Sequence, residues 1–292
     1  MEDAHRAYFF EGNKPSFRVQ RKGARFSLVD EKEKIELAAD SEGINRIHNL
    51  LKDMQVMRSI THNKWLFDTL LHEYQEGNLR TIAGKPYVVY DIETSLGSGG
   101  THNQCFEMAY SIASCDEIGE DKKFPYRYVD SDGAKRYADY LLSFDGRVIW
   151  FNSISFDNVV LLENVWYSEE QIKQLHQKSL DPFLLLWKLT GRRMSLNNVA
   201  STLIGESKTL SGGHEGQHLL EEYKKTGNEK FLTKVKEYCR NDVHLTLWVV
   251  LYLLHYKNVM LDGQSYEVDE PTLLDKGGYH PEETISLTWF DF

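Results

Sequence analysis

Two short apolar runs, residues 87–90 and 147–151, constrain the fold of this 292-residue chain more than any other feature. Each run has the length and composition of a buried strand, and acidic side chains follow each within a few residues. Between the two runs, the sequence predicts strands over 106–114 and 124–129 and a helix over 132–144. Strands that come first and then alternate with helices predict an α/β domain.

The chain after the second run is predicted to be mostly helical. Hydrophobic periodicity predicts helices over residues 156–165, 181–189, 195–204 and 229–256. In the segment before the last of these helices, Gly212, Gly213 and Gly216 disfavour a helix. Residues 258–292 are acidic and polar, which predicts an irregular C-terminal tail.

The first 80 residues differ in pattern from the rest of the chain. Loose alternation predicts a small antiparallel unit over 16–38, followed by helices over about 40–58 and 63–76. We therefore expect an N-terminal α+β extension of unknown role over 1–80, a main domain over 86–257 and the tail over 258–292.

The net charge, the cysteine content and the distribution of apolar residues argue against several classes of protein. The net charge of −10 argues against a generally basic nucleic-acid binder, but not against an enzyme whose carboxylates hold cations. Three cysteines without a CxxC pair give neither a disulfide framework nor a zinc motif. The sequence has no apolar stretch of about 18 residues and no signal-peptide pattern. We expect a soluble, cytoplasmic protein that does not contact membranes.

The first candidate motif is the pair Asp91 and Glu93, directly after the run 87–90. Carboxylates two residues apart on a strand point to the same face, and their mutual repulsion favours a bound cation. The alternative interpretation is a solvated strand end.

Two further motifs occur later in the chain. Asn152 and Asp157 come after the second apolar run, where α/β proteins often bind ligands, although Asp157 also fits an ordinary helix N-terminus. Tyr238 and Asp242 are four residues apart in the predicted helix 229–256 and therefore share one of its faces. The alternative for this pair is a hydrogen bond at a domain surface.

Together, the three motifs resemble those of the DEDD exonucleases in the ribonuclease H-like superfamily, in the tyrosine-bearing (DEDDy) branch. The segments YDIET, NSISFD and YCRND are similar to the first, second and third exonuclease motifs. The histidine branch carries His five residues before the last Asp, where this chain has Glu237, and Tyr238 stands four residues before it. The motifs are closest to the proofreading domain of family B DNA polymerases and its stand-alone relatives. This resemblance implies a mixed five-stranded sheet flanked by helices.

The resemblance also implies phosphodiester hydrolysis from a 3′ end with two divalent metal ions, Mg²⁺ or Mn²⁺. In that scheme Asp91 bridges both ions, Glu93 and Asp242 complete the site that activates water, and Asp157 holds the second ion. Tyr238 orients the attacking water through its hydroxyl group. Carboxylate oxygens are the ligands that such ions prefer.

For the substrate, the resemblance places the 3′ nucleotide at Thr94, Ser95 and Leu96. Leu96 lies one position nearer to the threonine than the leucine wedge of some relatives. The next nucleotide is expected at Asn152 and Phe156, where an aromatic ring can stack on a base.

Basic residues offer weaker indications of substrate binding. Lys188, Arg192 and Arg193 precede the segment 194–209, and Lys208 lies near its end. These side chains either follow the phosphate backbone or form a solvated charged surface.

The sequence thus predicts a metal-dependent 3′–5′ exonuclease that acts on the 3′ end of single-stranded nucleic acid, with DNA favoured over RNA. A non-catalytic nucleic-acid or protein adaptor on the same fold is one alternative, and a structure-specific endonuclease is another. Residues 1–80 and the C-terminal tail are the segments expected to bind any protein partner.

Overall fold

The computed structural model forms two compact units, Met1–Lys64 and Trp65–Phe292, which we describe separately. The boundary lies earlier than the end of the expected extension at residue 80. The structure describes residues 7–11, 14–22, 25–30, 36–38, 65–95, 104–112, 127–130, 133–152, 158, 161, 167–208, 213–261 and 264–280.

The first unit contains an antiparallel sheet in the order β1-β2-β3-β4. Its strands are β1 (Ala7–Glu11), β2 (Lys14–Lys22), β3 (Arg25–Asp30) and β4 (Glu36–Ala38). The predicted antiparallel unit over 16–38 is confirmed, and it begins earlier, at Ala7. The helix expected over 40–58 lies outside the described residues.

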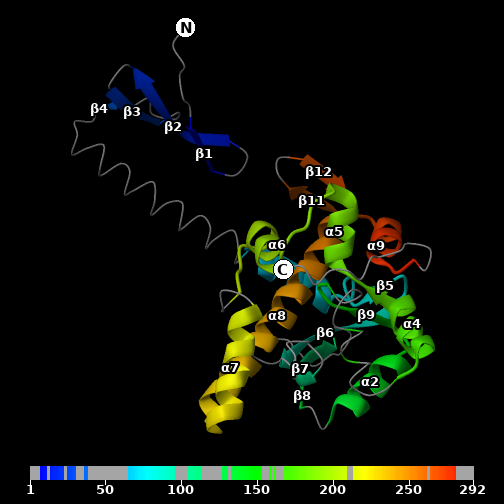
Figure 1. The fold of residues 1–292 in the computed structure, drawn as a ribbon. Coiled ribbons are helices and arrows are strands. Elements are labelled where there is room, and N and C mark those ends of the chain that lie inside the picture. Colours follow the sequence, from blue (N-terminus) through cyan, green and yellow to red (C-terminus); the bar gives the residue numbers. More distant parts are fainter. Residues whose placement is uncertain are drawn as a thin grey trace. The chain divides into compact units, whose positions relative to one another are not determined.

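The second unit is built on a mixed sheet in the order β10-β9-β6-β7-β8 (Figure 1). The strands are β6 (Lys85–Ser95), β7 (Gln104–Ile112), β8 (Arg127–Asp130), β9 (Arg147–Ile149) and β10 (Ser179–Leu180). The central strand β6 runs antiparallel to β7 and parallel to β9, and the short strand β5 (Thr81–Ile82) pairs with its beginning. The predicted mixed sheet is confirmed.

Helices cover both faces of this sheet. They are a helix over residues 65–75, α2 (Ala134–Ser143), α4 (Glu169–Lys178), α5 (Pro182–Thr190), α6 (Leu196–Leu203), α7 (Gly213–Thr226), α8 (Glu229–Tyr256) and α9 (Glu270–Gly277). Polar caps mark where several begin: the side chains of Ser168, Asp181 and Ser195 accept hydrogen bonds from backbone N–H groups of the first turn.

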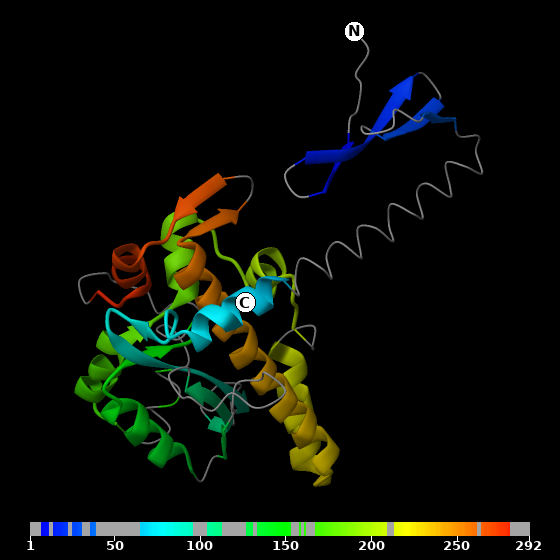
Figure 2. The same cartoon turned by 180° about the vertical axis from the view of Figure 1, so that it is seen from behind.

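Successive side chains of β6 point to opposite faces of the sheet. Tyr90 points toward α2, where its ring lies 5.9 Å from that of Tyr137. The next residue, Asp91, belongs to the opposite face, which α8 covers through its contacts with β6 and β7. Figure 2 shows the helix over residues 65–75, in cyan, lying across α8, and the rings of Phe67 and Trp248 meet there at 4.6 Å. The carboxylates of β6 are therefore enclosed between the sheet and α8.

Two expectations are wrong. Residues 258–277 are not irregular: they form the hairpin of β11 (Asn258–Leu261) and β12 (Gln264–Glu267), followed by α9. Val259, Leu261 and Leu273 are buried in the core, which explains why this polar segment is ordered. The glycines at 213 and 216 do not exclude a helix either, because both lie in α7.

No helix in the described part of the chain has the length and apolar character that crossing a bilayer requires.

Candidate active site

The two carboxylates of β6 are more than nine-tenths buried. Asp91 is 8% exposed and Glu93 is 7% exposed, and both point to the face covered by α8. Burial raises the pKa of both carboxyl groups well above their usual range, and the neighbouring carboxylates raise it further. The Oδ2 atom of Asp91 has no hydrogen-bond partner among the described residues. An arrangement of this kind is unfavourable unless a proton or a cation neutralises it.

Helix α8 supplies the opposite wall. Tyr238 and Asp242 share one face of α8, as their i and i+4 spacing predicted. Both are buried and line the same pocket as the β6 carboxylates. Burial raises the pKa of Asp242, and a nearby ammonium group on Lys208 lowers it in part. Burial also raises the pKa of Tyr238, so its hydroxyl stays protonated at neutral pH. Within the described part of the chain, the Oδ1 atom of Asp242 lacks a hydrogen-bond partner.

Lys208 lies in this site and not on a solvated surface. Its Nζ forms an ion pair with the Asp242 carboxylate and donates a hydrogen bond of 3.1 Å to the Tyr238 hydroxyl. The same Nζ lies 5.2 Å from the centre of the Tyr238 ring. Burial alone would lower the pKa of Lys208, but Asp242 outweighs burial and raises it, so the side chain is a permanent cation.

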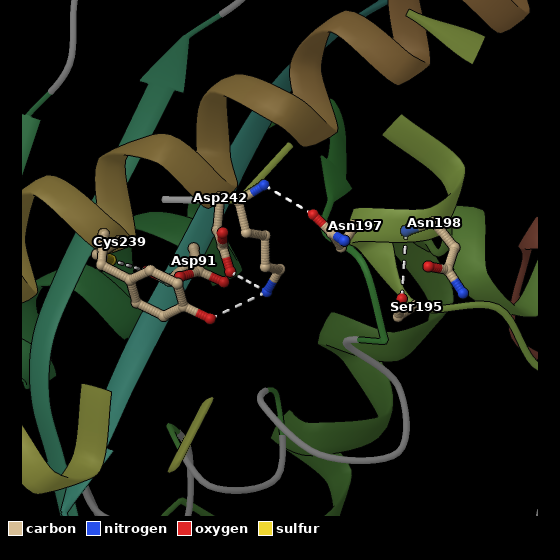
Figure 3. Close-up of polar contacts among 8 residues, drawn as sticks. Asp91, Ser195, Asn197, Asn198, Cys239 and Asp242 are labelled. Atoms are coloured by element: carbon tan, nitrogen blue, oxygen red, sulfur yellow. Dashed lines mark hydrogen bonds and ion pairs between the residues drawn. The ribbon is translucent and has the colours of Figure 1, made fainter. Parts of the chain in front are cut away.

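Helix α6 fixes the backbone of Lys208. The side-chain oxygen of Asn197 accepts a 2.9 Å hydrogen bond from the Lys208 N–H, which Figure 3 draws as a dashed line that ends on Asn197. Ser195 in turn caps α6 by accepting from the Asn198 N–H at 3.2 Å. A polar chain of contacts thus links the start of α6 to the carboxylates.

The carboxylates, Tyr238 and Lys208 line one pocket of about 540 Å³. Its polar wall comprises Asp91, Glu93, Thr94, Lys208, Tyr238 and Asp242. The remaining lining residues are mostly apolar and aromatic, with a few polar side chains among them: Ile92, Trp150, Phe151, Asn152, Phe183, Arg193, Met194, Ser195, Leu196 and Gln217. The pocket therefore combines a charged end with a surface on which a planar group can stack.

The predicted substrate-binding residues are only partly placed. Thr94 and Asn152 line the pocket, and Ser95 is the last residue of β6, but the position of its side chain is not described. Leu96, Phe156 and Asp157 lie outside the described residues. The expected role of Asp157 as a metal ligand therefore remains a prediction.

Asn152 has an unusual backbone. Its φ is 74°, in the left-handed region that asparagine tolerates better than most residues. Its N–H donates a 2.8 Å hydrogen bond to Oδ1 of Asp181, and the same oxygen caps α5 through the Phe183 N–H at 2.9 Å. Asp181 therefore fixes both Asn152 and Phe183 at the pocket.

Sequence reasoning missed the contribution of α7. Gly216 lies against the site, where an added Cβ would stand 3.2 Å from the Glu93 Oε2 atom and 3.5 Å from the Tyr238 ring. A glycine at this helical position permits a close approach to the carboxylates, which a larger residue would push aside. The sequence did contain a signal for this contact: Gly216, which was interpreted only as a residue that disfavours a helix.

The donor set fits a divalent cation. Oxygens of Asp91 and Asp242 are buried without a partner among the described residues, and Lys208 alone does not balance the three carboxylates. Asp91, Glu93 and Asp242 would hold such ions, because hard oxygen ligands suit Mg²⁺ and Mn²⁺.

A comparison with known families agrees with the architecture. Residues 88–254 match the profile of the RNase_H superfamily, which is more than half of the chain. The chain therefore belongs to the RNase H superfamily, whose nuclease-like fold implies nucleic-acid binding and whose nucleases use divalent metals. No curated protein matches the chain.

The raised carboxyl pKa values predict a pH-dependent affinity for metal. Asp91 and Glu93 hold protons to a higher pH than ordinary carboxyl groups, and these protons must leave before a cation binds. The affinity for Mn²⁺ should therefore rise with pH, by up to about tenfold per pH unit for each proton released. Calorimetric titrations at several pH values in buffers of different ionisation enthalpy count these protons. A pH-independent affinity would contradict the assignment.

Proposed function

We propose that the second unit is a metal-dependent 3′–5′ exonuclease of the tyrosine-bearing branch, acting on a single-stranded 3′ end with DNA favoured. The observation that carries the proposal is the convergence of three buried carboxylates and the Tyr238 hydroxyl on one pocket. Carboxylate oxygens at its charged end, without partners among the described residues, support a site for cations.

When bound, two divalent ions would neutralise the phosphate charge and lower the pKa of a bound water molecule. Asp91, Glu93 and Asp242 would hold them, together with Asp157 as the resemblance implies. The Tyr238 hydroxyl keeps its proton because burial raises its pKa, so it orients the attacking water and does not act as a base.

Lys208 would position this machinery. It donates to the Tyr238 hydroxyl and pairs with Asp242, so its ammonium group orients both side chains. A fixed cation at this point also favours the approach of a phosphate group to an acidic site.

The rest of the pocket suits an unpaired nucleotide. Phe151, Phe183 and Trp150 offer aromatic surface near the carboxylates, and base stacking on such side chains contributes about 1–3 kcal/mol. Arg193 also lines the pocket and would add positive charge for a phosphate of the bound strand. A volume of about 540 Å³ has room for one nucleotide but not for a duplex.

The activity is tested with a 5′-labelled single strand in Mg²⁺ or Mn²⁺. A ladder that shortens one nucleotide at a time from the 3′ end is expected, and DNA and RNA strands of equal sequence compare the two substrates. Binding without shortening would favour the adaptor, and no cleavage with either metal across several substrates would overturn the proposal.

Removing only the tyrosine hydroxyl should slow the reaction without weakening the metal site. For Tyr238→Phe we expect kcat to fall by about 10–10²-fold, because one positioned hydrogen bond is lost. The Mn²⁺ affinity should stay within about twofold, since phenolic oxygen is not among the preferred ligands of such ions. Single-turnover kinetics and Mn²⁺ titration separate the two effects. An unchanged kcat would remove Tyr238 from the proposed machinery.

A further inference from the structure

A thiol lies among the carboxylates, and the proposed nuclease has no use for it. Cys239 follows Tyr238 on α8, is fully buried, and its Sγ lies 3.5 Å from the backbone oxygen of Asp91 (Figure 3). One ligand atom each from Cys239, Asp91 and Glu93 can be chosen so that all three lie within 4.8 Å of one another.

This spacing is somewhat wider than that of the ligands of one bound ion. Tetrahedral zinc, with bonds of about 2.0–2.3 Å to oxygen and sulfur, places its ligand atoms about 3.3–3.8 Å from one another. A second observation points to a ligand as well. The Oδ2 atom of Asp91, a residue more than nine-tenths buried, has no hydrogen-bond partner among the residues that the structure describes. The three side chains would therefore have to draw closer together to share an ion, and this oxygen of Asp91 is available to do so.

We propose that Cys239, Asp91 and Glu93 form a site for a thiophilic divalent ion such as Zn²⁺ or Cd²⁺. The thiolate is a soft ligand that selects such ions, whereas Mg²⁺ and Mn²⁺ prefer the carboxylates alone. As the sulfur–metal bond forms, the thiol releases its proton to solvent, and any proton still held by Asp91 or Glu93 leaves as well.

The site would compete with the nuclease centre. Asp91 and Glu93 serve both, so a thiophilic ion held by Cys239 excludes the ions that support hydrolysis. The inference rests on the same carboxylates as the proposed function, but binding of the ion is measurable without any nuclease activity. Zn²⁺ and Cd²⁺ are then expected to inhibit the enzyme in competition with Mn²⁺.

The test uses the full chain with Cys105→Ser and Cys115→Ser, which leaves Cys239 as its single thiol. Titration with CdCl₂ should produce the ultraviolet charge-transfer band of a Cd²⁺–thiolate bond, saturating at one thiolate per chain. Adding Cys239→Ser should abolish the band and weaken Cd²⁺ binding by about 10–100-fold, while Mn²⁺ affinity stays within about twofold. Circular dichroism checks that each variant is folded.

The outcomes separate the two proposals. If Mn²⁺ binds but no band forms in the protein with Cys239 as its single thiol, the thiophilic site is refuted and the proposed nuclease stands. If Cys239→Ser leaves the affinity for Cd²⁺ unchanged, the thiophilic site is refuted as well. If neither Cd²⁺ nor Mn²⁺ binds, both proposals are contradicted. Should the serine variant fail to fold, the single-thiol protein alone still decides, because its band can arise only from Cys239.

Discussion

Asp91→Asn is expected to abolish nuclease activity while making the metal-free protein more stable. The amide has the shape of the carboxyl group but carries no charge, so it holds a divalent ion far more weakly than a carboxylate does. Ions of this kind contribute several kcal/mol of transition-state stabilisation, so a fall in rate of at least about 10³-fold is expected. The loss is measured on a labelled strand at saturating Mn²⁺.

The gain in stability of the metal-free protein also comes from removing the negative charge of the buried Asp91 carboxylate. Burial raises the pKa of Asp91, so this group favours the folded state below the ordinary carboxyl pKa and loses that contribution as pH rises through its raised value. The ionised form is thus costly without metal, and the advantage of Asn should grow with pH. Thermal unfolding in a chelator at pH 5 and pH 8 measures it. Such a trade of stability for activity is common at functional sites.

Asp145→Asn is the matched control. Asp145 is exposed and paired with Lys85, so this substitution should change neither the rate nor the pH dependence of unfolding by a measurable amount. If Asp91→Asn retained activity, a catalytic cation site at Asp91 would be contradicted. If it destabilised the metal-free protein at high pH, the cost assigned to the ionised Asp91 carboxylate would be contradicted.

Lys208→Met is expected to destabilise the metal-free protein strongly. The substitution keeps the aliphatic stem but removes the cation that pairs with Asp242, leaving a buried carboxylate uncompensated. Breaking a buried pair from one side costs at most about 3–5 kcal/mol, and the 20% exposure of the Lys208 side chain lowers this figure. Urea unfolding in a chelator measures the loss.

Metal should reverse much of this loss, since an ion at Asp242 replaces the missing charge. Saturating Mn²⁺ should therefore stabilise Lys208→Met more than it stabilises the wild type. Lys225→Met is the control, because Lys225 forms only an exposed pair with Glu222 and its loss should stay within about 0.5 kcal/mol. Equal effects of the two substitutions would show that Lys208 has no special electrostatic role.

Local pattern was sufficient to predict the strands and the shared faces of the site. The spacing of Asp91 and Glu93 placed both carboxylates on one side of β6, and the spacing of Tyr238 and Asp242 placed both on one face of α8. The length of β6 was underestimated, because the predicted strand ended where apolar residues ended. The strand continues to Ser95, since its carboxylates are buried against a helix and not solvated.

Features that depend on tertiary contacts were not predictable. The position of Lys208 is set by Asn197 and by the carboxylate that attracts it, neither of which a sequence pattern reveals. The C-terminal hairpin consists of strands too short for a clear alternation, and it is ordered by burial of Val259 and Leu261. The capping pair Ser168 and Gln171 was the overlooked signal for α4.

The central claim is that the buried carboxylates support hydrolysis from a free 3′ end. The most direct measurement compares a linear single strand with a covalently closed circle of the same sequence, with Mn²⁺, for the wild type and Asp91→Asn. We expect the wild type to release mononucleotides from the linear strand, to leave the circle intact, and to lose this activity in the variant. Cleavage of the circle by the wild type, or equal activity of the variant, would contradict the account.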